Sequence, residues 1–367
     1  MRIALDARNW RSRFQTGIER YVFLLLESLT SINTDTIESI HVVVLNDEEP
    51  HFPKPHSPLF PIHIRGVATK HPRNLQKLMA EIKPTVLHSL FDLPDGITNC
   101  RVVHTLHDPG RYIFPELMVA RIRDRESPML IRTLKDHKIS ALITVSESSL
   151  ADIRRLLPVD GVICRVVPNF LSRTFLDALE KRSSRSEIER RYGFCGPYLL
   201  AVGAFSPTKN ISILCQAFRD AREMNPQRIP KNLVIVGRKG WDRNIRSSRE
   251  YGLVLTGHVP EHDLAGLYSH AHALVFPSLY EGFGLPILEA LAAGCPVLCS
   301  NLPVFSEIGG QAVRLIDAQN VSALARALLD FVDFRPSPQD VQHVLNRYSA
   351  ETTMRELMAT YSAALAA

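Results

Sequence analysis

The stretch of this sequence best suited to binding an anion is a glycine-rich loop between an apolar run and a helical segment. Residues 273–276 are all apolar, as in a strand buried on both faces of a parallel sheet. A helix is predicted over 285–293. Its start offers the main-chain N–H groups of Phe283, Gly284 and Leu285, together with the positive end of the helix dipole. A helix start of this kind binds phosphate or another anion.

Two carboxylates frame this loop. Glu281 lies in the loop, and Glu289 lies about one turn inside the predicted helix, within an apolar segment. Because a buried carboxylate without a partner is costly, a pair of sugar or ribose hydroxyls would satisfy Glu289. A helix cap at Glu281 and a structural ion pair at Glu289 would explain each residue separately. Together, in one loop and helix with two glycines, they favour a ligand site.

Three more candidates follow predicted strands. Lys209 stands between a strand at 198–203 and a helix that begins at Ile211, and Arg238 follows the run Val234–Gly237. The carboxyl ends of parallel strands are where open α/β sheets bind ligands. His107 ends the run 102–106, just before a Pro-Gly break. The simpler interpretations are an exposed lysine and a turn capped by the aspartate after His107.

These loops belong to a chain in which strands and helices alternate, as in doubly wound sheets. The N-terminal half has strand-like runs at 2–6, 40–45, 62–64, 86–88, 102–106, 141–145 and 163–167. A length of 367 residues suits two domains, each with its own core. Residues 181–192 are charged, contain serine and have little apolar content, which places the boundary near 172–196.

The run Glu281-Gly-Phe-Gly-Leu-Pro-Ile-Leu-Glu289 resembles the paired-glutamate motif of retaining glycosyltransferase family 4. Residues 257–268 and 300–307 are similar to the same family, so the resemblance covers most of the C-terminal half. It implies the GT-B fold, an α/β architecture of two Rossmann-like parallel-sheet domains that face each other across a cleft. The implied parts are an acceptor-binding domain at 1–172, a linker at 173–196, a nucleotide-sugar-binding domain at 197–348 and a C-terminal helix, about 349–367, that crosses back to the first domain.

The resemblance also implies roles for residues of the C-terminal half. Lys209 would hold the donor pyrophosphate, Glu281 the hydroxyls of the donor sugar and Glu289 the ribose. The nucleobase would be bound near Val259, largely through the backbone. Many relatives have a basic residue at the position of Ala204 or Thr208, and this sequence has neither. Arg238, in a run similar to one found in GDP-sugar enzymes that ends at Trp241, would supply the missing charge.

In the N-terminal half, the resemblance implies that Gly17 faces the donor phosphates and that His107 approaches the transferred sugar. Many relatives have Gly or Gln where this chain has Glu19, so contacts with the acceptor differ at that point. No Asp-x-Asp metal motif occurs in the sequence. We therefore expect no metal or other cofactor, with a nucleotide sugar as co-substrate.

Composition narrows the class of protein. A net charge of +5 is small for a nucleic-acid-binding protein and suits an anionic small molecule or an anionic membrane surface. Six cysteines without Cys-x-x-Cys spacing indicate reduced, mostly buried thiols. With no signal peptide and no run of about 20 apolar residues, a cytoplasmic protein is expected. The basic stretches 70–83 and 121–138 fit either a solvated helix face or peripheral contact with anionic lipid or a lipid-diphosphate acceptor.

The leading hypothesis is a retaining, metal-independent hexosyltransferase of surface-glycan assembly. It would transfer mannose or rhamnose from a GDP-sugar to a glycan or polyprenyl-diphosphate-linked acceptor at the inner face of the cell membrane. The donor rests on analogy alone. A UDP-sugar transferase of the same fold, a catalytically silent partner subunit, and an epimerase or phosphorylase of the same fold are the alternatives.

Overall fold

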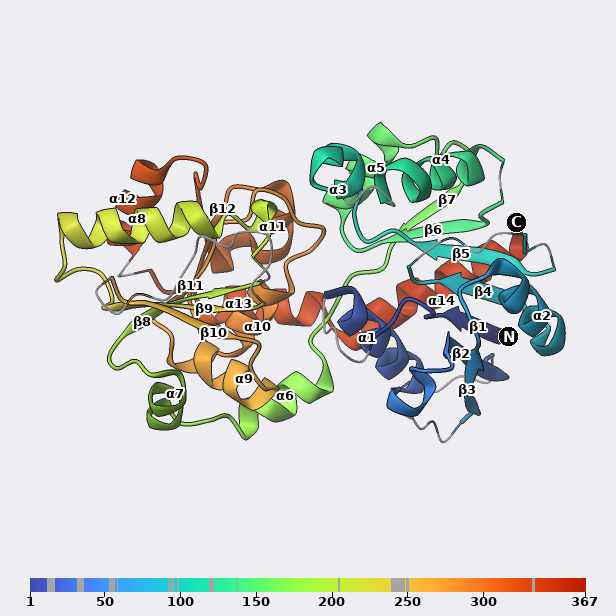
Figure 1. The fold of residues 1–367 in the computed structure, drawn as a ribbon, viewed down its shortest axis with the longest axis horizontal. Coiled ribbons are helices and arrows are strands. Elements are labelled where there is room, and N and C mark those ends of the chain that lie inside the picture. Colours follow the sequence, from blue (N-terminus) through green and yellow to red (C-terminus); the bar gives the residue numbers. More distant parts are fainter. Residues whose placement is uncertain are drawn as a thin grey trace. The chain divides into compact units, whose positions relative to one another are not determined.

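A computed structural model shows that the chain forms two compact units (Figure 1). Unit 1 comprises Met1–Phe170 and Ala350–Ala367, and unit 2 comprises Leu171–Ser349. The structure describes residues 1–11, 17–31, 36–52, 57, 59–91, 93, 96–97, 99–118, 122–136, 138–203, 205–238, 248, 251–331 and 334–367. Ala204, Trp241 and the start of the basic stretch at Arg121 lie outside these residues.

Unit 1 is built on a seven-stranded parallel sheet in the order β3-β2-β1-β4-β5-β6-β7. Its strands are β1 (Arg2–Asp6), β2 (Ser39–Leu45), β3 (Ile62–Val67), β4 (Val86–Ser89), β5 (Arg101–Thr105), β6 (Ala141–Thr144) and β7 (Ile163–Val166). Each of these strands coincides with an apolar run predicted from the sequence. The chain proceeds outwards from β1 on one side and from β4 on the other, so the topological switch point lies between them.

The helices of unit 1 are α1 (Gly17–Ser31), α2 (Pro72–Ile82), α3 (Gly110–Ile113), α4 (Ser127–Lys135), α5 (Glu147–Leu156) and α14 (Ala350–Ala366). Ser146 caps α5 by accepting a hydrogen bond of 3.0 Å from the N–H of Ser149, and serine is among the residues that N-cap positions prefer. The C-terminal helix α14 packs against α1 and against β5, β6 and β7. Residues from both ends of the chain therefore build this unit.

A buried polar network joins α14 to the sheet of unit 1. His88 of β4 is fully buried, and its Nδ1 lies 2.8 Å from the hydroxyl of Tyr361 on α14. Its Nε2 lies 2.7 Å from Oγ1 of Thr105 on β5, which in turn lies 3.4 Å from the hydroxyl of Tyr21 on α1. His88 is therefore a packed histidine with both ring nitrogens bonded.

Unit 2 contains a six-stranded parallel sheet in the order β10-β9-β8-β11-β12-β13. Its strands are β8 (Tyr198–Val202), β9 (Asn232–Val236), β10 (Leu253–Gly257), β11 (Ala273–Phe276), β12 (Val297–Ser300) and β13 (Val313–Ile316). The chain proceeds from β8 to β10 on one side and from β11 to β13 on the other. The switch point therefore lies between β8 and β11, which hydrogen-bond to each other.

The helices of unit 2 are α6 (Arg173–Glu180), α7 (Arg185–Tyr192), α8 (Ile211–Met224), α9 (Glu261–His270), α10 (Leu285–Ala292), α11 (Pro303–Gly309), α12 (Val321–Asp330) and α13 (Pro338–Arg347). Helices α8 and α12 lie side by side on one face of the sheet (Figure 1). Their apolar faces and the inward side chains of β8, β9, β11 and β12 form one continuous core. This packing holds the loops at the carboxyl ends of the strands in place.

The segment 173–196, expected as a linker, is folded. Its two helices, α6 and α7, both pack against α9 and belong to unit 2, whose boundary lies between Phe170 and Leu171. The charge-rich sequence misled the prediction because most of α7 is solvated: its only buried residue is Ile188. A capping box between Ser184 and Glu187 starts α7, and Gly193 ends it with φ of 71°.

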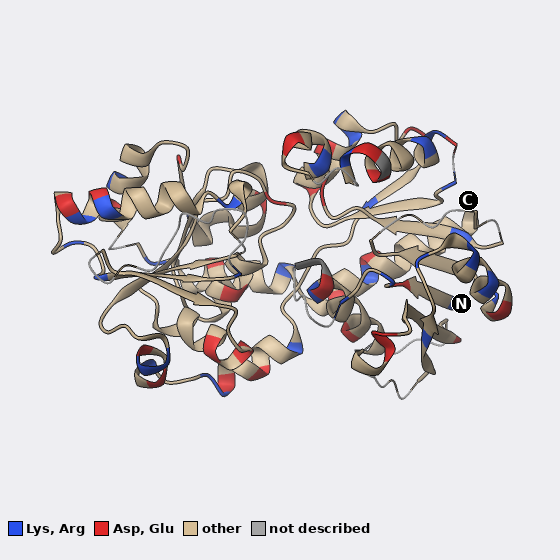
Figure 2. Cartoon of the chain, viewed as in Figure 1, with Lys and Arg blue, Asp and Glu red and all other residues tan. Residues whose placement is uncertain are grey.

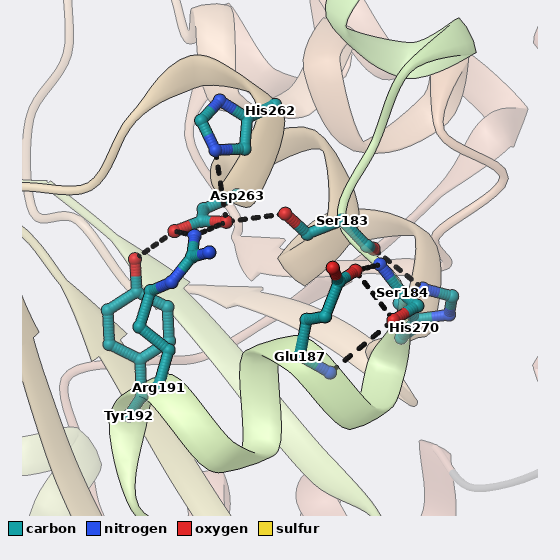
Figure 3. Close-up of polar contacts among 8 residues, drawn as sticks. All are labelled: Ser183, Ser184, Glu187, Arg191, Tyr192, His262, Asp263 and His270. Carbon is teal, nitrogen blue, oxygen red and sulfur yellow. Dashed lines mark hydrogen bonds and ion pairs between the residues drawn. The ribbon is translucent and has the colours of Figure 1, made fainter.

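A buried carboxylate fastens this segment to α9 (Figure 3). Asp263 is fully buried and accepts hydrogen bonds of 2.6 Å from the hydroxyls of Ser183 and Tyr192, and it forms an ion pair with Arg191. Nε2 of His262 lies 3.5 Å from the same carboxylate. Burial alone would raise the pKa of Asp263, but the hydrogen bonds from Ser183, Tyr192 and Arg191 outweigh it and hold the pKa below its usual range.

Replacing Asp263 with alanine should lower the free energy of unfolding of unit 2 by about 3 kcal/mol, because the donors around it lose their shared acceptor. Urea denaturation, with hydrogen exchange of peptides from α7 and α9, measures this loss. Asp177→Ala is the matched control, since Asp177 forms only an exposed ion pair with Arg173 on α6 and its loss should cost less than about 0.5 kcal/mol. Equal losses in the two variants would contradict a structural role for Asp263.

The cysteines agree only in part with the expectation of buried thiols. All six are free; Cys215, Cys295 and Cys299 are buried, whereas Cys195 is exposed. Burial raises the pKa of the Cys295 thiol to about 12. That thiol is therefore an unreactive core residue at neutral pH.

Candidate functional site

The loop after β8 brings Lys209 to the switch point of unit 2. Gly203 has φ of 150°, which turns the chain out of the strand, and a short 3₁₀ turn at Pro207–Lys209 follows. Asn210 adopts the left-handed conformation with φ of 58° and donates a hydrogen bond of 2.7 Å to the carbonyl of Ala318. No side chain caps the start of α8. This geometry leaves Nζ of Lys209 5.3 Å from the centre of the Phe276 ring at the end of β11.

The loop after β11 brings Glu281 to the same place. The two loops are fastened together by a hydrogen bond of 2.7 Å from the N–H of Leu279 to the carbonyl of Thr208. Oε1 of Glu281 accepts a hydrogen bond of 2.7 Å from Ser278 and forms an ion pair with Nζ of Lys209. The side chains of Lys209 and Glu281 are 24% and 13% exposed, so solvent screens this pair less than a surface ion pair.

The start of α10 lies in the same loop. Gly284 occupies its N-cap position with φ of 123°, and no side chain caps the helix. A Cβ at Gly284 would lie 3.2 Å from the Phe305 ring, so both the backbone conformation and the space favour glycine. Phe283 is buried edge-on against Tyr348 with ring centres 5.4 Å apart, which anchors the loop, and Leu285 is the first helical residue. The main-chain amides at this start suit an anion.

Glu289 is buried inside α10, as its apolar neighbours predicted, and is 2% exposed. Its Oε2 accepts a hydrogen bond of 2.8 Å from the hydroxyl of Tyr268 on α9. One oxygen of Glu289 therefore has a partner within the protein, and the expected bond to ligand hydroxyls stays a prediction. Reasoning from sequence missed Tyr268 because the two residues are 21 positions apart and on different helices.

Arg238 and Val259 lie in the loops after β9 and β10. The Arg238 side chain is exposed, and its carbonyl accepts a hydrogen bond of 3.2 Å from the N–H of Phe205, so the loops after β8 and β9 run beside each other. Val259 is buried and precedes α9. The structure thus brings Lys209 and Glu281 into direct contact and leaves Arg238 and Val259 in neighbouring loops at the same edge of the sheet.

Two of the predicted residues belong to unit 1. Gly17 is the first residue of α1. His107 follows β5 and lies edge-on to Tyr21 with ring centres 4.6 Å apart. Burial lowers the pKa of His107 to about 4, the charge of Arg111 acts in the same direction, and a backbone hydrogen bond at Leu90 opposes them. The imidazole is therefore neutral at pH 7.

His107 and its neighbour Asp108 differ in their hydrogen bonds. Asp108 accepts a hydrogen bond of 2.7 Å from the N–H of Gly110, which is the turn-capping role expected for it. Nε2 of His107 is buried and has no hydrogen-bond partner among the described residues. A neutral imidazole with one unbonded nitrogen is suited to a hydrogen bond with a substrate hydroxyl.

In unit 2, the chemistry of the site is that of a cation paired with the Glu281 carboxylate, beside a helix start with a glycine N-cap and a second carboxylate, Glu289, buried inside that helix. The cation and the helix start attract an anion, and Glu281 and Glu289 accept hydrogen bonds from hydroxyl groups. Within the described part of the chain, no group of three or more His, Cys, Asp or Glu side chains is arranged to hold a metal ion. The site therefore combines features that suit a phosphorylated, polyhydroxylated ligand.

Comparison with known proteins agrees with this chemistry. The family described as "Glycosyltransferase Family 4" matches residues 16–174, and the family described as "Glycosyl transferases group 1" matches residues 186–345. The O-antigen chain mannosyltransferase B of Escherichia coli is 31% identical over 283 residues, which are 73% of this chain and 71% of that protein. The chain belongs to the family 4, group 1 glycosyltransferases. The resemblance seen in the C-terminal half thus extends to the N-terminal half.

One further relative is matched over about half of its own length, whereas the solved structures are matched over nearly all of theirs. The O-antigen chain mannosyltransferase RfbU of Salmonella typhimurium is 28% identical over 210 residues, 56% of this chain and 53% of that protein. Among solved structures, Anabaena Alr3699/HepE in complex with UDP and glucose has a TM-score of 0.67 at 15% identity and covers 99% of both chains. Sucrose-phosphate synthase from Thermosynechococcus elongatus has a TM-score of 0.66 at 19% identity, covering 100% of this chain and 96% of that one. At these identities the likeness shows the fold, which is GT-B.

Proposed function

We propose that this glycosyltransferase moves mannose from a GDP-sugar to a glycan or polyprenyl-diphosphate-linked acceptor in surface-polysaccharide assembly, with retention and without a metal ion. Rhamnose is the second sugar compatible with the sequence motifs. Support for mannose comes from the E. coli and Salmonella relatives, whose names give mannosyl transfer in the O-antigen chain. The observation that carries the proposal is the direct contact of Lys209 with Glu281 at the switch point of unit 2.

In this proposal the donor diphosphate binds Lys209 and the main-chain amides at the start of α10, those of Phe283, Gly284 and Leu285. A cation about 4 Å from the leaving oxygen contributes roughly 4 kcal/mol at an effective dielectric constant near 20. Arg238, whose side chain is exposed in the loop after β9, supplies further positive charge. Because these groups supply the positive charge that a metal ion provides in other transferases, the proposed reaction needs no metal.

The remaining groups of unit 2 orient the donor. Glu281 accepts hydrogen bonds from the hydroxyls of the transferred sugar, and Glu289, positioned by Tyr268, accepts from the ribose. The base lies near Val259 and is bound mainly by backbone. In unit 1, the unbonded Nε2 of His107 forms a hydrogen bond with the transferred sugar, and Gly17 gives the donor phosphates access to main chain at the start of α1.

The proposed reaction takes place on one face of the sugar. The bond between the anomeric carbon and the phosphate oxygen breaks, and the acceptor oxygen bonds to the same carbon from the same side. The proton of the acceptor hydroxyl goes to the departing phosphate oxygen. Neither glutamate is a nucleophile in this scheme, so substitution of Glu281 or Glu289 slows transfer by disturbing the orientation of the sugar.

Contact with an anionic membrane is part of the proposal and would be peripheral. None of the helices in the described ranges is long and apolar enough to cross a bilayer. Charged residues lie mostly on helices and loops (Figure 2). On α2, which forms most of the basic stretch 70–83, Arg73 and Lys77 are exposed and share the helix with the exposed Glu81. This mixture of charges favours a solvated helix face for the stretch 70–83.

A thermal-shift panel with GDP, UDP, ADP and TDP tests the donor class. GDP at a hundred times its Kd should stabilise the protein by about 2.7 kcal/mol and raise Tm by roughly 5–10 °C, with smaller shifts from the other three. Transfer of labelled mannose from GDP-mannose should then be seen in both the presence and absence of EDTA.

Each contrary result has a definite meaning. A selective shift with UDP would replace the proposed donor by a UDP-sugar. Stabilisation by GDP without any turnover of GDP-mannose would favour a catalytically silent partner subunit. Loss of transfer with EDTA that added Mg²⁺ restores would contradict metal independence.

A further inference from the structure

The lysine that we assign to the donor diphosphate already has a carboxylate partner. Nζ of Lys209 forms an ion pair with Oε1 of Glu281, and Ser278 donates a hydrogen bond of 2.7 Å to the same oxygen. Both members of the pair are held in place. The stem of Lys209 lies along Gly203 and its ammonium lies over the Phe276 ring. Glu281 therefore competes with any phosphate for the same cation.

The competition is strong because the pair is mostly shielded from solvent. With the two side chains only 24% and 13% exposed, charges at this position interact at a lower effective dielectric than on the surface. A nucleoside diphosphate brings two to three negative charges towards Lys209. The carboxylate of Glu281 both occupies the lysine and repels those charges. Binding of the diphosphate alone must overcome both effects.

A complete donor differs from a nucleoside diphosphate in what it offers to Glu281. The hydroxyls of its sugar donate hydrogen bonds to the carboxylate, which replace the bond that Glu281 loses when Lys209 turns to the phosphates. The nucleoside diphosphate lacks the transferred sugar and therefore lacks these hydroxyls. We infer that Glu281 is a selectivity residue that weakens binding of the nucleoside diphosphate product relative to the sugar-bearing donor. The inference rests on the proposed function of this site.

The test is to measure how Glu281→Gln changes the two affinities separately. Gln preserves the shape of the side chain and removes its charge. We expect Kd for GDP to fall on the order of tenfold, while Kd for GDP-mannose changes less or rises. The ratio of the two Kd values, measured by isothermal titration calorimetry in the absence of acceptor, therefore shifts in favour of GDP. The same change should appear in kinetics as stronger product inhibition by GDP.

The matched control is Glu223→Gln, which removes one negative charge from unit 2 at the exposed far end of α8. Glu223 lies 12 residues along the helix from Ile211, about 18 Å from the helix start, so both affinities should stay as in the wild type. A second control, Ser278→Ala, keeps the charge of Glu281 and removes only its hydrogen bond. It should tighten GDP binding much less than Glu281→Gln.

The outcomes separate this inference from the proposed function. If GDP binding is lost in Lys209→Ala but is not tightened in Glu281→Gln, Glu281 has no part in selectivity, and the proposed function still stands. Equal tightening for GDP and GDP-mannose would also overturn the inference, because the sugar would then gain nothing from the carboxylate. If neither compound binds the wild type, the proposed function fails first. Should a UDP-sugar prove to be the donor, the same measurement is made with UDP and that sugar.

Discussion

Replacing Lys209 with alanine should lower kcat/KM for glycosyl transfer on the order of a hundredfold or more. The donor diphosphate gains negative charge as it leaves, and Lys209 is the cation that the loop after β8 positions for it, next to Glu281 and the Phe276 ring. The amides at the start of α10 remain in the variant, so some activity should persist. Steady-state transfer from GDP-mannose, with donor and acceptor varied in turn, measures the loss.

Two control variants show that the loss comes from the missing charge at that position. Lys231→Ala removes an exposed lysine that precedes β9, at the opposite edge of the same parallel sheet, and should leave kcat/KM unchanged. Lys209→Arg keeps a cation and should recover part of the rate. Thermal melting verifies that Lys209→Ala is folded. Wild-type kcat/KM in folded Lys209→Ala would exclude the lysine from the reaction.

His88 and His104 should together take about 3 kcal/mol from the stability of unit 1 between pH 7.5 and pH 5.5, and His41 and His107, whose pKa values burial lowers to about 4, add to this loss. Burial lowers the pKa of His88 to about 3, and burial together with the charge of Arg111 lowers that of His104 to about 3. Both imidazoles stay neutral in the folded state, whereas in the unfolded chain they take up protons below about pH 6.5. The unfolded state then binds more protons, so stability falls as the pH falls through this window, by about 1.4 kcal/mol for each histidine at pH 5.5.

Among the described residues, the groups that act on these two histidines are hydroxyls, a main-chain group and positive charges. His88 bonds to Thr105 and Tyr361, and His104 lies 3.2 Å from the hydroxyl of Ser89. Arg111, His88 and His107 all act to lower the pKa of His104. Urea denaturation at the two pH values, followed by hydrogen exchange of peptides from β4 and β5, measures the loss.

Variants assign the pH effect to particular residues. His104→Gln removes one of these groups and should reduce the difference between the two pH values by about 1.4 kcal/mol, whatever it does to stability at pH 7.5. His51→Gln removes an exposed histidine of unit 1 and should leave that difference as in the wild type. A wild-type free energy of unfolding that does not change between pH 7.5 and 5.5 would show that His88 and His104 are accessible to protons in the folded protein.

Much of the fold was predictable from local pattern. Strand-like runs of three to six residues separated by helical segments indicated all seven strands of unit 1, and the glycine-rich run 281–289 indicated both a helix start and a family. Such signals are readable because a strand buried on both faces needs consecutive apolar residues, and a helix start needs particular residue types. The prediction of a linker at 173–196 was wrong because it, too, relied on local sequence. Its local composition resembles a linker, and only its packing on α9 makes it part of unit 2.

What the sequence determined by itself is which residue types stand at which strand ends: a lysine at 209, a glutamate at 281, a second glutamate inside the following helix and a histidine at 107. Tertiary structure alone decided which of them touch. The order β10-β9-β8-β11-β12-β13 places the loops after β8 and β11 together, so that Lys209 and Glu281 form an ion pair across 72 positions of sequence. The packing of helices likewise places the hydroxyl of Tyr268 beside Glu289. It also places donors from α7 beside Asp263. Strand order and helix packing bring together residues that are distant in the chain, and no local pattern of amino acids records those distances.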